Sequence, residues 1–163
     1  MLGFAVPICV VSASGTDTGR SSGHQIRMHM AHISKIEGIG ATYTEKLGTV
    51  GVKSTDDLLA KAADKKGRET VSSATGISEV VLLKWVNQAD LQRVKGVGEE
   101  YGELLERSGV DSVPELAQRN AANLAAKMAE VNGTLKLTTS VPGEATVASW
   151  IAHAKQLDRI VTH

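Results

Sequence analysis

The sequence has little cysteine, few aromatic residues and no net charge, and each shortage limits what the protein can be. Its single cysteine, Cys9, excludes a disulfide framework, a four-cysteine zinc site and an iron–sulfur cluster. Aromatic residues make up 3% of the chain against 42% hydrophobic residues, so the core must consist of Ala, Val, Ile and Leu. That inventory suits small packed helices and argues against a β-sandwich. The 163 residues allow one domain or two small ones in tandem.

The charge balance removes the simplest argument for nucleic-acid binding, and the hydrophobic runs argue against a membrane span or a secretory signal. With 18 basic and 18 acidic side chains, the chain lacks the overall basic surface that attracts nucleic acid to many binding domains. Residues 2–11 are hydrophobic, but this run is too short to span a bilayer, and no basic residue precedes it as a secretory signal requires. A cytoplasmic location is therefore the default expectation.

Residues 1–30 differ from the rest and are predicted to form a flexible N-terminal extension. Residues 12–24 are rich in Gly, Ser and Thr, as flexible segments are. This stretch is best explained as an added upstream segment, and a cleaved export signal is the alternative. His24, His29 and His32 have no spacing typical of a metal site, so we expect no bound metal.

From about residue 33 onward the chain carries an internal repeat. At an offset of 58 positions, residues 36–59 align with residues 94–117, and after an insertion the match resumes between residues 85–89 and 150–154. The expected units are residues 31–89 and 90–163. We therefore predict an all-α fold of two duplicated units.

Each unit opens with a hydrophobic stripe of helical spacing that is interrupted by two glycines. The pairs are Gly38 with Gly40 and Gly96 with Gly98. Within a continuous helix each glycine would cost about 1 kcal/mol, so the chain is expected to turn there and then enter a helix of about nine residues. The pattern predicts a tight hairpin in each unit, and a second, shorter one around Gly76.

Further start and stop residues predict the remaining helices. The second helix of each unit is expected to begin after Ser54 or Thr55 and after Ser112, where Ser112 and Glu115 have capping-box spacing. Trp85 and Trp150 occupy equivalent hydrophobic positions and are interpreted as core residues rather than platforms for stacked bases. The other expected caps are Gly51 and Gly109 at helix ends and Ser78 at the start of the fourth helix.

These residues carry a resemblance to two known groups. Residues 36–40, Ile-Glu-Gly-Ile-Gly, followed by Tyr and Leu at helical spacing, resemble the helix-hairpin-helix motif of many DNA repair and replication proteins. The two-unit layout, with residues 94–98, 74–78 and 85–90, resembles the bacterial family catalogued as domain of unknown function 4332, over residues 33–157. The motif implies that backbone amides of the glycine turn and of the next helix hold a phosphate oxygen without reading base sequence. The family itself implies no settled function.

A helix start presents unpaired N–H groups and the positive end of the helix dipole, which favours an anion. Residues 33–89 hold eight basic and seven acidic side chains, a balance of +1, whereas residues 90–163 hold eight and ten, a balance of −2. Glu99 and Glu100 would also repel a phosphate from the second hairpin, which is the weaker candidate (Gly96, Val97, Gly98). The predicted phosphate-binding residues are Gly38, Ile39, Gly40 and Ala41, assisted by Lys46, Lys65, Lys66 and Arg68.

The leading prediction is a non-enzymatic protein that binds nucleic acid, DNA above all, through its backbone, weakly and in a salt-sensitive way. The alternative is a protein-interaction or scaffold module in which the glycines only form turns and the lysines only solvate a helix end. No nucleophile–base set, nucleotide loop or metal cluster is present, so we expect neither catalysis nor a cofactor.

Overall fold

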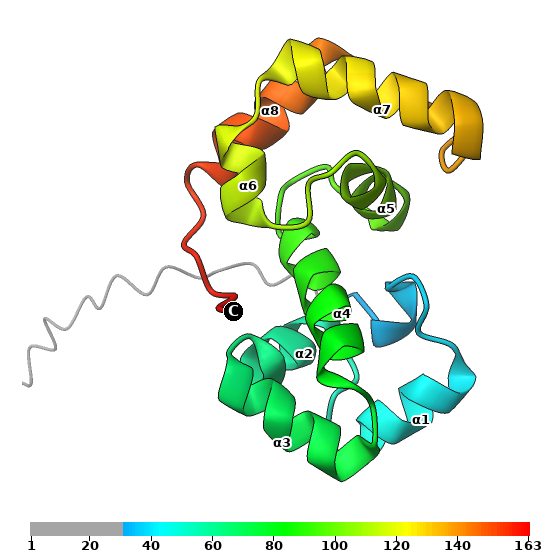
Figure 1. The fold of residues 1–163 in the computed structure, drawn as a ribbon, viewed down its shortest axis with the longest axis vertical. Helices are drawn as coiled ribbons and strands as arrows, with labels where there is room; N and C mark the ends of the chain where they lie inside the picture. Colours follow the sequence, from blue (N-terminus) through cyan, green and yellow to red (C-terminus); the bar gives the residue numbers. More distant parts are fainter. Residues whose placement is uncertain (1–30) are drawn as a thin grey trace, which may run out of the picture.

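The computed structural model describes residues 31–163, so the predicted extension of residues 1–30 lies outside the described part (Figure 1). Within residues 31–163 the fold is all-helical, as predicted, with no strand and one isolated bridge between His32 and Ser54. The elements are a 3-10 helix η1 (Ile33–Lys35) and the α-helices α1 (Ala41–Thr49), α2 (Thr55–Ala62), α3 (Lys65–Thr75), α4 (Glu79–Leu91), α5 (Glu99–Arg107), α6 (Val113–Gln118), α7 (Ala121–Leu135) and α8 (Glu144–Ala154).

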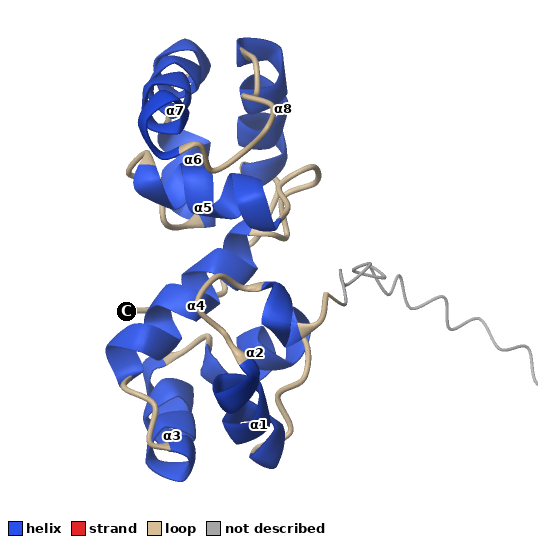
Figure 2. Ribbon diagram, turned by 90° about the vertical axis from the view of Figure 1, so that its right-hand side faces the viewer, coloured by secondary structure: helices blue, strands red, loops and turns tan. Residues whose placement is uncertain are grey.

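The helices gather into two groups, each around its own hydrophobic core (Figures 1 and 2). In the first group, which we call the first lobe, α2 packs on α3 and α4, and α1 packs on α3 and η1. In the second lobe, α6 and α7 pack on α8, and α5 packs on α7. As expected from the composition, Val, Leu, Ile and Ala dominate both cores, and Trp85 and Trp150 are buried members of the first and second core.

Helix α4 joins the two lobes. Ala89 belongs to the first core and Leu91 to the second. From residue 85 to residue 91 every side chain of α4 is buried, because helices of both lobes cover it. The polar residues in this stretch, Asn87, Gln88 and Asp90, are therefore buried as well.

The ends of α1 and α5 show how glycine stops these helices. Gly51 and Gly109 adopt left-handed φ values of 74° and 87°. The N–H of Val52 then donates to the carbonyl of Leu47 at 3.0 Å, and the N–H of Val110 to that of Leu105 at 2.9 Å. This is the Schellman arrangement, so both predicted C-caps are confirmed.

The helix starts agree with prediction at two positions and differ at a third. Ser54 and Asp57 form a reciprocal capping box at α2, and Ser78 accepts from the N–H of Val81 at α4. Hydrogen bonds from the N–H groups of Lys53 and Ser54 lower the pKa of Asp57. The capping box predicted at α6 is wrong, because the Ser112 side chain makes no cap bond there.

Candidate functional site

Residues 36–41 form a glycine-containing turn before α1, for which we keep the name first hairpin, and two buried isoleucines hold this turn on the core. Ile36 and Ile39 both enter the first core, and the N–H of Ile39 donates to the carbonyl of Ile36 at 3.1 Å. Between them Gly38 adopts a left-handed φ of 87°. A Cβ at Gly38 would lie 3.4 Å from Nε1 of Trp85, so both the backbone angle and the neighbouring indole favour glycine.

Helix α1 begins with N–H groups that have no acceptor in the described part of the chain. Within residues 31–163 no hydrogen bond is made by the N–H groups of Gly38, Gly40, Ala41 and Thr42, and all four residues are exposed. Gly40, the N-cap, provides no capping side chain, and no acidic residue lies in the first turn. Among the described residues, the successive N–H groups of Gly40, Ala41 and Thr42 at the positive end of the helix dipole therefore have no acceptor, and the first turn carries no carboxylate.

Two details of this hairpin differ from the sequence prediction. The N–H of Ile39 is already bonded to Ile36, so Ile39 supplies no free donor, whereas Thr42, which was not predicted, does. Gly40 has an extended backbone with φ −82°, so only the first glycine of the pair requires a positive angle. The general rule that a helix leaves its first N–H groups unpaired would have identified Thr42.

The second hairpin has the same backbone and a different charge. Gly96 has a φ of 93°, the N–H of Val97 is bonded to Val94 at 3.0 Å, and a Cβ at Gly96 would lie 3.0 Å from Nε1 of Trp150. Gly98 is again an N-cap without a capping side chain. The first turn of α5 carries Glu99 and Glu100, whose carboxylates already complement the helix dipole.

An aromatic pair supports each hairpin. The rings of Tyr43 and Trp85 lie 5.1 Å apart in an edge-to-face arrangement, and those of Tyr101 and Trp150 lie 5.2 Å apart. Each tryptophan is only 2% exposed, so both are core residues, as predicted. Tyr101 donates its hydroxyl to the carbonyl of Ser140 at 3.2 Å, whereas Tyr43 is 38% exposed at the rim of the first hairpin.

The predicted basic residues do not form one patch around the first hairpin. Lys46 is exposed in the last turn of α1, the helix that the hairpin starts. Lys65 and Lys66 are exposed in the first turn of α3, which in Figure 1 runs from the side of α2 toward α1, so they lie at its far end from α1. Lys61 is held away from the hairpin, because its ammonium donates to the carbonyl of Val50.

Arg68 is not a surface residue. It is 3% exposed, and its guanidinium donates to the carbonyls of Ala62, Ala63 and Thr162 at 3.2, 2.8 and 2.6 Å. It therefore caps the C-terminal end of α2 from inside the protein and is unable to reach a phosphate. The prediction that Arg68 contributes to the basic patch is corrected accordingly.

Several charged and polar groups of the second lobe are paired with neighbouring groups. Glu106 pairs with Lys84 at 3.3 Å and accepts from Gln88 Nε2 at 2.6 Å, which joins α5 to α4. The N–H of Lys95 beside the second hairpin donates to Nδ1 of His153 at 3.0 Å. Glu99 and Glu100 remain exposed, so the surface at this hairpin is acidic.

Residues 31–163 contain neither a cluster of metal-ligating side chains nor a helix that could span a membrane. Nowhere in residues 31–163 do three His, Cys, Asp or Glu side chains gather in a way that could hold a metal ion. None of the helices in this part of the chain is long and apolar enough to cross a membrane.

Comparison with known proteins identifies a family. The family model described as domain of unknown function (DUF4332) matches residues 37–157, a range that includes all eight α-helices of the described residues. No curated protein and no solved structure shows significant similarity to the chain. Because the match covers well over half of its length, the chain belongs to this family.

Proposed function

We propose that this member of the DUF4332 family binds the phosphate backbone of nucleic acid, DNA above all, at the first hairpin, and that its two lobes are duplicated helix-hairpin-helix units. The proposal is supported by the exposed N–H groups of Gly40, Ala41 and Thr42 at the start of a helix without a first-turn carboxylate. Such a helix start stabilises an anion through both hydrogen bonds and the dipole. Contact with backbone alone gives no discrimination between base sequences.

The same geometry sets the strength of the interaction. The first hairpin and Lys46, the predicted cation on the same helix, neutralise about one or two phosphates. A plot of log affinity against log salt concentration should therefore have a slope of about −1 to −2. This is far weaker than the binding of domains that contact six or more phosphates. Lys65 and Lys66 contribute little, because they lie at the other end of α3.

The two hairpins of this chain provide a matched test. In one variant Ala41→Glu and Thr42→Glu give the first hairpin the carboxylates of the second, and in another Glu99→Ala and Glu100→Thr do the reverse. The control, Ala126→Glu with Ala129→Glu, adds the same charge at exposed positions of α7. Binding is measured by fluorescence anisotropy of labelled single- and double-stranded DNA across a salt series.

We expect the first variant to raise the dissociation constant by roughly tenfold, about 1.4 kcal/mol, and the reverse variant to lower it. Carboxylates in the first turn complement the dipole of α1, so a loss of binding is not explained by unfolding of that helix. The control should change affinity much less. Equal losses in the variant and the control, or no binding at about 50 mM salt, where electrostatic contacts are strong, would reject the proposal.

A protein-interaction module is the second candidate, and one observation favours it. The surface at the second hairpin carries the exposed carboxylates Glu99 and Glu100, which suit a basic protein partner and not a nucleic acid. If the wild-type protein does not bind DNA, the variant with Glu99→Ala and Glu100→Thr becomes the control for a pull-down from lysate.

A further inference from the structure

After α8 the chain returns to the first lobe. We call residues 155–163 the return segment, and Figure 1 shows it running from α8 to the side of α2. Val161 in this segment is 4% exposed and belongs to the first hydrophobic core, although α8 before it belongs to the second. Its neighbour Ile160 is 37% exposed.

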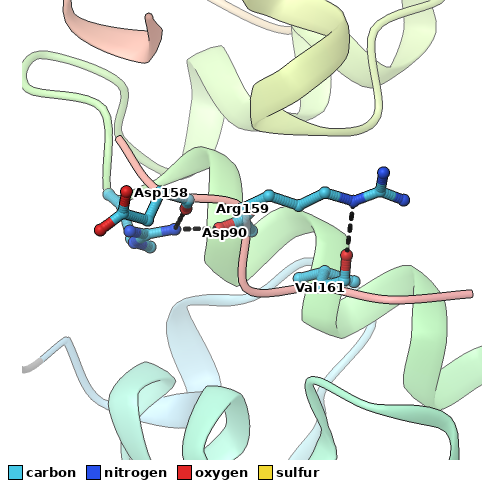
Figure 3. A network of polar contacts seen from close by, with 5 residues as sticks. Asp90, Asp158, Arg159 and Val161 are labelled. Carbon is cyan, nitrogen blue, oxygen red and sulfur yellow. Dashed lines mark hydrogen bonds and ion pairs between the residues drawn. The ribbon is translucent and has the colours of Figure 1, made fainter. Parts of the chain in front are cut away.

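One polar anchor ties the return segment to the end of α4. Nη1 of Arg93 donates to the carbonyl of Asp158 at 3.1 Å and pairs with Oδ1 of Asp90 at 2.7 Å (Figure 3). Asp90 is 1% exposed and lies on α4 where the first core ends and the second begins. The return segment is therefore fixed to the connection between the lobes.

A second polar anchor lies in the first lobe. The buried guanidinium of Arg68 donates to the carbonyl of Thr162, and the N–H of Thr162 donates to the carbonyl of Ala63 at 3.0 Å. Without the return segment Arg68 would lose one of its three acceptors, which is costly for a buried charge. Between the anchors Nε of Arg159 donates to the carbonyl of Val161 at 3.3 Å (Figure 3).

We propose that the return segment is a clip that fixes the orientation of the two lobes. Without the return segment, the lobes would be joined only on one side, by α4 and by the contacts of Glu106 in α5 with Lys84 and Gln88 in α4. The return segment adds a separate connection, fastened beside α4 at Asp158 and in the first core at Val161 and Thr162. Two attachments at separate points restrict rotation that a connection on one side permits, so the clip holds the two hairpins at a constant distance and angle.

The two adjacent residues Val161 and Ile160 provide a matched pair for the test. Val161→Asp places a carboxylate in the first core, whereas Ile160→Asp makes the same kind of change at a more exposed position. Spin labels are attached at Glu69→Cys in α3 and Ala126→Cys in α7, both exposed, in the full chain with Cys9→Ser. Double electron–electron resonance gives the distance distribution between the lobes, and hydrogen exchange of the Thr162 amide reports whether the segment is attached.

In the protein with native Val161 and Ile160, and with Ile160→Asp, we expect a narrow distance distribution and a protected Thr162 amide. Val161→Asp should broaden the distribution and expose the amide. Should that variant fail to fold, Val161→Ala removes two methyl groups and should speed exchange of the amide roughly tenfold. The proposal is overturned if the Thr162 amide exchanges fast while the distances between the spin labels stay the same. It is also overturned if this amide stays protected in both Val161 variants, or if Ile160→Asp has the same effect as Val161→Asp.

Discussion

Alanine substitution at the four hairpin glycines tests which of them the fold requires. The four positions differ in backbone angle and in the space available for a Cβ. Gly38 and Gly96 have positive φ values, which cost other residues about 1–3 kcal/mol. Alanine recovers about 0.4–1 kcal/mol by restricting the unfolded chain. We therefore expect Gly38→Ala to reduce the free energy of unfolding by about 1–2 kcal/mol.

The other three positions rank around this value. At Gly96 a Cβ would be 3.0 Å from Trp150 Nε1, instead of 3.4 Å from Trp85 at Gly38, so the indole must move and the loss should reach about 2–3 kcal/mol. Gly40 and Gly98 have negative φ and no heavy atom within 4 Å of a Cβ. Their alanine variants should stay within about 0.5 kcal/mol of the wild type, since a poorer N-cap offsets the entropy gained.

Urea unfolding followed by tryptophan fluorescence measures these differences. For a chain of this size, a loss of 1–2 kcal/mol also lowers the melting temperature by about 2–8 °C. The slope of free energy against urea concentration should stay constant, because the surface buried on folding does not change. If Gly38→Ala and Gly40→Ala lose the same stability, or if Gly40→Ala loses more, the turn is not held by the backbone angle of Gly38.

Three further predictions concern capping and buried carboxylates. Ser54→Ala should cost about 1 kcal/mol and Ser112→Ala less than about 0.5, because only Ser54 caps its helix; thermal unfolding monitored by circular dichroism would show it, and equal losses would contradict it. Hydrogen bonds lower the pKa of Asp57 in the folded protein. Its contribution to the free energy of unfolding is therefore complete above the unfolded pKa of 3.8 and is lost as the pH falls through the lower folded pKa. Asp57→Asn should remove this part of the pH dependence of urea unfolding. Burial raises the pKa of Asp90, although Arg93 opposes the shift. The wild type should therefore lose stability as the pH rises from the unfolded pKa of 3.8 through the raised folded pKa. If Asp90→Asn shows the same loss in urea unfolding, Asp90 is not its source.

The features that the sequence predicted correctly depend on local rules. Glycine at a helix end, as at Gly51 and Gly109, and serine before a helix, as at Ser54, act on groups within a few residues, so spacing alone reveals them. Ser112 fits the same spacing, but its hydroxyl makes no cap bond. Spacing gives the residue types that a cap needs and not the direction of the side chain.

The features that the sequence did not predict depend on distant parts of the chain. Arg68 has the sequence context of a surface cation, yet one of its acceptors, Thr162, lies 94 positions away. The return segment enters the first core through Val161 alone, and one hydrophobic residue has no periodicity to detect. Ile39 was predicted as a free donor at the first hairpin, but its N–H is occupied by a short turn bond to the carbonyl of Ile36, which the sequence does not reveal.

The position of α4 in both cores has a consequence for how the protein melts. A helix forms and frays cooperatively, because each of its backbone hydrogen bonds depends on the neighbouring turn. Loss of the first core would release the buried stretch of α4 that also supports Leu91 in the second core. Damage on one side should therefore spread to the other, and the described part of the chain should unfold in a single calorimetric transition.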